Sequence, residues 1–231
     1  EEIIKKVLEL TFVDEIIIVD DGSKDKSLEI AQKFESDKVK VYGLPKNQGK
    51  TAAISHAISK ATTDIVAVQD ADLEYSPEEY ERLLKPLIDG YADAVFGSRF
   101  LTYETRRVGN YWHTMGNRFL TGFSNALSNL YLTDMETCYK LMKSALYRNL
   151  DLQEKRFGVE PEITCKLARA KVRFYEVSIS YHGRTYDEGK KIHARDGFRA
   201  IYCLRRYGLF SRKISNVTSD GQNIRNGTNG L

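Results

Sequence analysis

Short apolar runs alternate with amphipathic stretches through the first hundred residues. The runs predict β-strands over residues 15–19, 39–44, 64–69 and 93–97. Between them, apolar residues recur at helical spacing, which predicts helices around residues 3–8, 28–34, 53–61 and 77–88. Strands that alternate with helices form βαβ crossovers, so we predict an α/β fold with a mostly parallel, doubly wound, Rossmann-like sheet flanked by helices.

The pattern changes after about residue 105. A mostly helical stretch covers residues 108–130, and a helix and a strand are expected over residues 161–170 and 172–180. A basic segment follows, and residues 211–231 have the composition of a disordered tail. No repeat or Pro- or Gly-rich linker divides the chain, so one folded domain is expected over residues 1–210.

The composition is that of a globular protein. Of 231 residues, 42% are hydrophobic and 29% are charged, and the net charge is +3. This balance excludes a disordered chain and argues against a nucleic-acid partner. The longest aliphatic run, Ile16 to Val19, is far shorter than the about 18 residues that a membrane-spanning helix needs. The three cysteines form no zinc-binding pattern, which favours a reducing, cytoplasmic location.

Polar residues follow three of the predicted strands. These segments are Asp20-Asp21-Gly22-Ser23, Asp70-Ala71-Asp72 and Gly97-Ser98-Arg99. Ligands of parallel α/β sheets bind beyond the carboxyl ends of the strands. We therefore expect the three segments to border one binding site.

The Asp70-Ala71-Asp72 segment is a candidate metal site. Where the chain leaves the sheet, both carboxylates can turn toward the same crevice and hold a divalent cation that also binds nucleotide phosphates. Glu74 could add a third oxygen. The alternative is an ordinary turn, in which Asp is common, but the preceding strand and the second acidic strand end favour the metal site.

Two further loops are candidate ligand contacts. An acidic residue in Asp20-Asp21-Gly22-Ser23 can accept hydrogen bonds from a ribose or a base, although a capped turn explains the same residues. Asn47-Gln48-Gly49-Lys50 opens a helix, and its backbone N–H groups and Lys50 are suited to phosphate. It is not a Walker A loop, and a solvated helix start is the alternative.

Asp134 lies in a polar run after the long helix, where a carboxylate could act as a general base or simply cap a helix. The four histidines show no metal-ligand or triad spacing, and none is assigned a catalytic role.

In chain order, these segments together with Tyr181-His-Gly-Arg184-Thr-Tyr186 resemble an inverting family 2 glycosyltransferase. More narrowly, roughly residues 1–210 are similar to polyprenyl-phosphate sugar synthases of the dolichyl-phosphate mannose synthase type. The resemblance implies a GT-A fold and transfer of a sugar from a nucleotide-diphosphate sugar, such as GDP-mannose or a UDP-sugar, to a polyprenyl or dolichyl phosphate.

The resemblance also implies roles for single residues. The nucleotide-sugar would be bound by Asp20, Asp21, Ser23, Lys50, Asp70, Ala71 and Asp72, and Mg²⁺ or Mn²⁺ by Asp70, Asp72 and Glu74. Asp134, Arg99 and Arg184 would be catalytic, with Asp134 as base or as organiser of the acceptor site. Arg99, Arg184 and Lys190 would hold the acceptor phosphate, with the donor as the alternative for Arg99.

The chain departs from the family pattern in two ways. The family opens with an apolar strand and a nucleotide-binding loop, whereas Glu1 to Ile4 resembles the helix that follows them, so we expect the first, central strand to be lacking. Many such synthases carry C-terminal membrane helices, and none is seen here. Contact with the cytoplasmic face of a membrane would then use the helix over 108–130 or the basic stretch over 195–210, with Phe198, Ile201 and Leu204 on one side; an ordinary packed helix is the alternative for that stretch.

Two other functions fit the same residues. One is a glycosyltransferase acting on a polysaccharide or a protein. The other is an inactive nucleotide-sugar-binding fragment, for which the lacking strand is the main argument.

Overall fold

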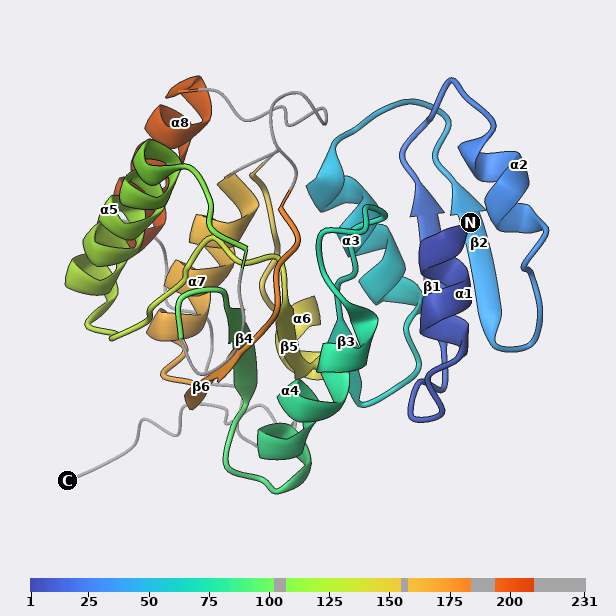
Figure 1. Ribbon diagram of the computed structural model, residues 1–231, viewed down its shortest axis with the longest axis horizontal. Coiled ribbons are helices and arrows are strands. Elements are labelled where there is room, and N and C mark those ends of the chain that lie inside the picture. Colours follow the sequence, from blue (N-terminus) through green and yellow to red (C-terminus); the bar gives the residue numbers. More distant parts are fainter. Residues whose placement is uncertain (102–106, 155–157, 184–193, 210–231) are drawn as a thin grey trace, which may run out of the picture.

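The computed structural model describes residues 1–101, 107–154, 158–183 and 194–209 (Figure 1). Its strands are β1 (Ile16–Asp20), β2 (Val39–Gly43), β3 (Ile65–Ala67), β4 (Ala94–Ser98), β5 (Lys140–Lys143) and β6 (Phe174–Ser178). Its helices are α1 (Glu2–Leu8), α2 (Ser27–Gln32), α3 (Lys50–Lys60), the 3₁₀ turn η1 (Pro77–Glu79), α4 (Tyr80–Ile88), α5 (Tyr111–Ser128), α6 (Ser144–Arg148), α7 (Val159–Arg169) and α8 (Ala194–Leu209). The predicted tail over 211–231 lies outside the described residues.

The described strands form two sheets rather than the single sheet that was predicted. One has the order β3-β5-β4-β6, and the other is the parallel pair β1-β2. β4 and β6 are parallel, whereas β5 runs antiparallel to both β3 and β4. The prediction of a mostly parallel α/β architecture is confirmed, but β5 and α6 were missed.

β1 and β3 are edge strands of the two separate sheets. Within the described ranges, β1 pairs with β2 and β3 pairs with β5, and neither has a second neighbour. Every residue of β1 is half-buried, although its apolar sequence predicts a fully buried strand.

Helices cover both faces of the larger sheet. Val95 of β4 packs with Leu83 and Leu87 of α4 in one apolar cluster. Its neighbours Ala94 and Phe96 point to the other face, into a cluster with residues of α3, α6 and α7. Alternating side chains of a strand face opposite ways, so β4 is buried on both sides and forms the centre of a three-layer structure.

A third cluster joins α5, α7 and α8 at the end of the molecule opposite α1 and α2 (Figure 1). Leu204 of α8 is fully buried there, whereas Phe198 is exposed and Ile201 is half-buried. The prediction that these three share one surface was therefore wrong, because Leu204 faces the core. Across the part of the chain that the structure describes, no helix is long and apolar enough to cross a membrane.

Candidate active site

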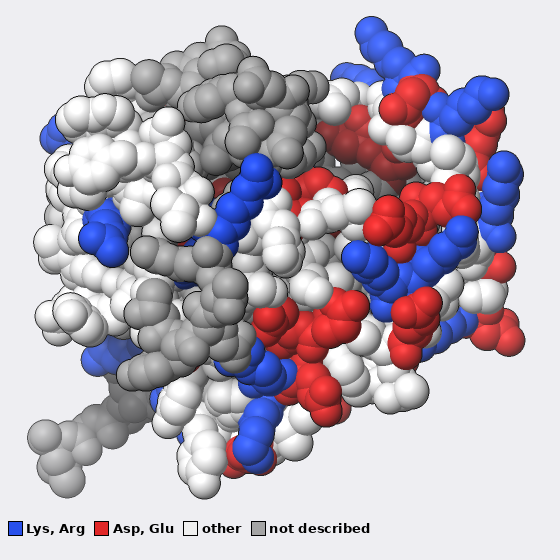
Figure 2. All heavy atoms as spheres, viewed as in Figure 1, with Lys and Arg blue, Asp and Glu red and all other residues white. Residues whose placement is uncertain are grey.

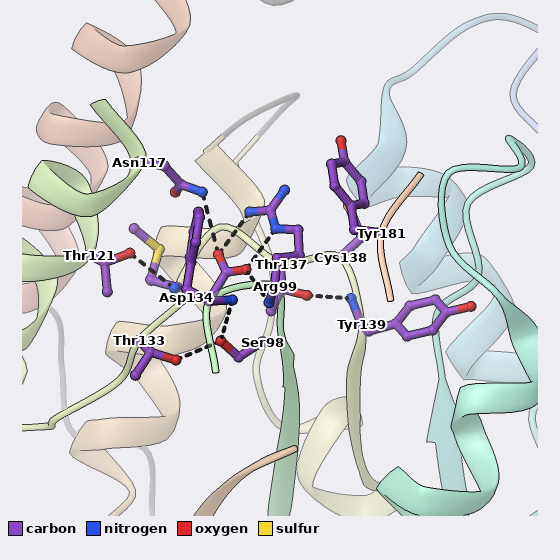
Figure 3. Close-up of polar contacts among 12 residues, drawn as sticks. Ser98, Arg99, Asn117, Thr121, Thr133, Asp134, Thr137, Cys138, Tyr139 and Tyr181 are labelled. Carbon is purple, nitrogen blue, oxygen red and sulfur yellow. Dashed lines mark hydrogen bonds and ion pairs between the residues drawn. The ribbon is translucent and has the colours of Figure 1, made fainter. Parts of the chain in front are cut away.

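Arg99 and Asp134 form a two-pronged ion pair just beyond the carboxyl end of β4 (Figure 3). Arg99 Nε lies 2.6 Å from Asp134 Oδ2, and Arg99 Nη2 lies 2.8 Å from Oδ1. The backbone N–H of Arg99 also donates to Oδ2 at 3.1 Å. Asp134 is fully buried, so this pairing supplies the compensation that a buried carboxylate requires.

The loop that carries Asp134 is held from three sides. From β6, the carboxylate of Glu176 accepts the backbone N–H groups of Thr133 at 2.9 Å and Asp134 at 3.2 Å. From β4, Ser98 Oγ lies 2.6 Å from Thr133 Oγ1. From α5, Asn117 Nδ2 reaches Asp134 Oδ1 at 3.5 Å (Figure 3). These contacts fix the position of the carboxylate before any ligand binds.

Asp21 contacts the loop that precedes α3. Its two carboxylate oxygens accept the backbone N–H groups of Gln48 and Gly49, each at 2.7 Å. These backbone N–H groups are the phosphate ligands that the sequence predicts. In the structure they donate to Asp21, just before the first residue of α3. The contact closes the β1 loop onto the loop before α3, because a carboxylate is stabilising at a helix N-terminus.

The turn around Gly22 allows this approach. Gly22 has φ of +70°, and a Cβ at this position would lie 2.7 Å from the backbone N of Asn47. Asp20 Oδ2 accepts the N–H of Ser23 at 2.9 Å, which completes a capped turn. The interpretation of Asp20 and Ser23 as turn-forming residues describes this contact.

Lys50 links three segments that are distant in sequence. Its ammonium lies 3.0 Å from Asp70 Oδ1, 3.3 Å from Glu160 Oε1 and 3.6 Å from Cys138 Sγ. Burial lowers the pKa of Lys50, but the charges of Glu160, Cys138 and Asp70 outweigh it and raise the pKa well above its usual value. Lys50 is therefore a permanent cation beside the predicted metal ligands.

The three carboxylates proposed for the metal do not converge on one point. In the ranges covered by the structure, no group of three or more His, Cys, Asp or Glu side chains is placed to hold a metal ion. Asp70 pairs with Lys50, and Asp72 Oδ1 accepts the N–H of Glu74 at 3.2 Å. Glu74 Oε2 accepts the hydroxyl of Tyr181 at 2.9 Å, and its grouping with the other two as a metal ligand remains a prediction. Ala71, which stands between Asp70 and Asp72, is exposed.

Tyr181 connects the two halves of the site. Its hydroxyl binds Glu74, and its ring lies 5.0 Å from the guanidinium carbon of Arg99. The ring also packs on Tyr75, which stacks on Tyr139. Tyr181 therefore links the acidic loop after β3 to the Arg99–Asp134 pair. Arg184 and Lys190 lie outside the described residues.

Comparison with known proteins identifies the family. A model described as "Glycosyl transferase family 2" matches residues 1–150. The chain belongs to glycosyl transferase family 2.

Two curated relatives and one solved structure illustrate the likeness. The chain is 27% identical over 217 residues to UDP-N-acetylglucosamine–dolichyl-phosphate N-acetylglucosaminyltransferase of Methanococcus voltae, covering 83% of this chain and 84% of that protein. It is 36% identical over 88 residues to dolichol-phosphate mannosyltransferase of Pyrococcus furiosus, covering 38% and 25%. Glucosyl-3-phosphoglycerate synthase from Mycobacterium tuberculosis, solved with Mn²⁺, UDP-glucose and phosphoglyceric acid, has a TM-score of 0.65 at 20% identity, covering 89% of this chain and 73% of that one. The expected GT-A fold of this glycosyltransferase is confirmed.

Two glutamates with buried carboxylate oxygens in this family 2 chain were missed by the sequence reasoning. Glu136 Oε1 and Glu160 Oε2 have no hydrogen-bond partner among the described residues. Burial, followed by the charge of Glu160, raises the pKa of Glu136 to about 8, and burial lowers the pKa of nearby Lys140. Glu136 stands two residues after Asp134, which was the available signal; nothing local distinguishes Glu160.

Replacing Asp21 by Ala should destabilise the protein, because the N–H groups of Gln48 and Gly49 lose their acceptor. We expect the free energy of unfolding in urea to fall by about 1–3 kcal/mol. The matched control is Asp37→Ala on the exposed surface, for which a change within about 0.5 kcal/mol is expected. Equal effects of the two substitutions would show that the loop contact has no energetic weight.

Glu136 should make stability depend on pH. Its folded-state pKa is raised from 4.5 to about 8, so the folded protein retains a proton that the unfolded chain releases. The resulting stabilisation is present below about pH 4.5 and is lost as pH rises toward about 8, with a limiting slope of about 1.4 kcal/mol per pH unit. Urea unfolding from pH 5 to 8.5 should show this decline in the wild type and a flatter profile in Glu136→Gln. Exposed Glu35→Gln should retain the wild-type slope, and an unchanged slope in Glu136→Gln would contradict the assignment.

Proposed function

We propose that this glycosyltransferase transfers a sugar from a nucleotide-diphosphate sugar to the phosphate of a polyprenyl lipid, with inversion at the sugar carbon. The main observation that supports this proposal is the Arg99–Asp134 ion pair, which fixes a guanidinium at the end of β4 beside the acidic loop after β3. The names of the two curated relatives support a dolichyl-phosphate acceptor. The site is proposed to act from the cytoplasm, at the surface of the membrane that contains the lipid.

The donor side offers oxygen ligands suited to Mg²⁺ or Mn²⁺. Asp70 and Asp72 are two carboxylates on one short loop, and such cations commonly take one or two carboxylates and complete their coordination with phosphate oxygens and water. Two protein ligands are therefore a fitting set, although Glu74 contacts Tyr181 instead. A bound cation would neutralise the charge of the departing nucleoside diphosphate.

Lys50 has a distinct role in this scheme. It holds the Asp70 side chain in place, since its ammonium lies 3.0 Å from that carboxylate. Its contact with Glu160 then holds the ammonium where a pyrophosphate would meet it. Asp21 is proposed to shape the nucleotide loop through the backbone of Gln48 and Gly49, with Asp20, Ser23 and Ala71 at its border.

On the acceptor side, Asp134 is proposed to position Arg99 rather than to remove a proton. Both of its oxygens are occupied by hydrogen bonds from Arg99 and Asn117. A lipid phosphate is already anionic and nucleophilic near neutral pH, so positioning and charge neutralisation suffice. Arg184 and Lys190 are proposed to add positive charge beside the acceptor phosphate.

Transfer should depend on a divalent cation and on Asp72. With radiolabelled UDP-N-acetylglucosamine, UDP-glucose or GDP-mannose, Mn²⁺ and a polyprenyl phosphate, label from one donor should enter the organic phase. Asp72→Asn should lower the rate by about 100-fold or more, because the leaving group loses charge stabilisation, and EDTA should abolish transfer. Exposed Asp37→Asn is the matched control. Absence of lipid product with every donor, while a polysaccharide or protein acceptor is labelled, would refute the proposed acceptor.

Arg99→Lys should impair use of the acceptor selectively. Lysine keeps the charge but cannot make the two-pronged contact with Asp134, so the cation loses its fixed position. We expect the KM for polyprenyl phosphate to rise and kcat to fall by about 10–100-fold, with the KM for the donor unchanged. Arg82→Lys, on the surface of α4, is the control. A selective rise in the donor KM would place Arg99 on the donor side instead.

A further inference from the structure

Helix α5 buries polar residues and exposes large apolar ones, although its Leu120, Phe123 and Leu127 are half-buried in the cluster with α7 and α8. Its buried residues are Asn117, Thr121 and Ser124. Its outer surface exposes large apolar side chains, among them Trp112 at 79% and Phe119 at 63%. A helix on the surface of a water-soluble domain ordinarily buries its apolar face. On the inner side of α5, Asn117 and Thr121 bind the Asp134 loop, through Asp134 Oδ1 and the N–H of Met135.

The exposed apolar residues of this segment follow helical spacing. Trp112, Met115 and Phe119 follow one another at intervals of three and four residues, and Tyr111 precedes Trp112 directly. Together they form a stripe along α5. Val108, just before the helix, is also exposed. Contiguous exposed apolar surface of this kind marks an interaction site rather than scattered surface residues.

Helix α8, which packs against α5, carries a second exposed set. Phe198 at 74%, Tyr202 and Leu209 are exposed, together with Arg199, Arg205 and Arg206. Arg199 and Arg206 contact the buried carboxylate of Glu154, which leaves their positive charge partly balanced. We call the exposed apolar and arginine residues of the two helices, together with Val108, the α5–α8 surface.

The charge of this surface differs from that of the whole chain. The chain has 35 Lys and Arg against 32 Asp and Glu, whereas no described side chain exposed on α5 or α8 is acidic. Arg118 of α5 adds to the arginines of α8. In Figure 2, the part of the molecule over α5 is mostly white with isolated blue groups, and red groups gather toward the opposite end.

We propose that the α5–α8 surface binds an anionic phospholipid bilayer and lies in the headgroup region. Aromatic side chains favour that region, and arginines are attracted to anionic headgroups. A second copy of the chain is a poorer occupant, because facing two arginine-bearing surfaces without acidic partners brings like charges together. The inference rests on the proposed function and deepens it: one helix would touch the membrane with its outer face and the Asp134 loop with its inner face.

The surface can be tested with the full chain. Trp112 is the single tryptophan, so intrinsic emission reports this surface directly. Vesicles of phosphatidylcholine and phosphatidylglycerol at 3:1 should shift its emission to shorter wavelength, and brominated phospholipid should quench it. The double variant Trp112→Ser/Phe119→Ser should co-sediment with these vesicles at least tenfold less than the wild type. Circular dichroism should show unchanged melting, because both side chains are exposed in the folded chain.

A matched control replaces two apolar side chains of similar exposure elsewhere on the surface. Ile88→Ser/Tyr91→Ser alters side chains that are 71% and 61% exposed near the end of α4, and it should co-sediment like the wild type. The proposal would be overturned if both double variants lost vesicle binding equally, or if the wild type bound pure phosphatidylcholine vesicles equally well. It would also be overturned if the shift in Trp112 emission followed self-association, measured by light scattering, rather than the addition of vesicles.

The enzymatic readout separates this proposal from the proposed function. The Trp112→Ser/Phe119→Ser variant should transfer sugar to citronellyl phosphate dissolved in buffer at the wild-type rate and lose at least tenfold with long-chain polyprenyl phosphate in vesicles. A wild-type chain that binds vesicles but transfers to neither acceptor would retain the membrane surface and refute the function. Equal losses with both acceptors would overturn the membrane surface while retaining the function.

Discussion

The site depends on the cost of burying the charge of Asp134. A fully buried carboxylate must be paired and hydrogen-bonded, and Arg99 supplies both requirements. The same demand draws the amide of Asn117 inward from α5. A local electrostatic requirement thus places a polar side chain on the buried side of that helix.

The sequence predicts the fold well where strands are apolar and poorly where they are not. β1, β2, β4 and β6 stand out as runs of branched and aromatic residues. β5 does not, because Lys140 and Lys143 flank only Leu141 and Met142. Its strand conformation comes from pairing on both sides, with Val66 opposite Met142 and Val95 opposite Leu141. Pairing with distant segments cannot be read from a local pattern.

For the site, residue types at strand ends identify the right loops but not their partners. The geometry of parallel strands brings the Asp70 loop and Arg99 to one edge, and this follows from the sequence alone. Other contacts do not follow from the sequence. Asp21 accepts backbone N–H groups 27 and 28 residues away, and Lys50 contacts Glu160, which is 110 residues away. Such contacts depend on how helices pack over the sheet, which spacing along the chain does not encode. The roles of Arg184 and Lys190 remain predictions.

The position of β5 has a consequence for how the chain folds. β3 and β4 are not neighbours, because β5 lies between them and follows them by more than forty residues in the sequence. As the chain emerges from the ribosome, the first hundred residues therefore contain two strands of the larger sheet that cannot pair with each other. Their hydrogen-bonding edges stay open until residues 140–143 arrive, and closure of this long loop delays assembly. The chain is most exposed to wrong pairing during that interval, before its own central partner has been made.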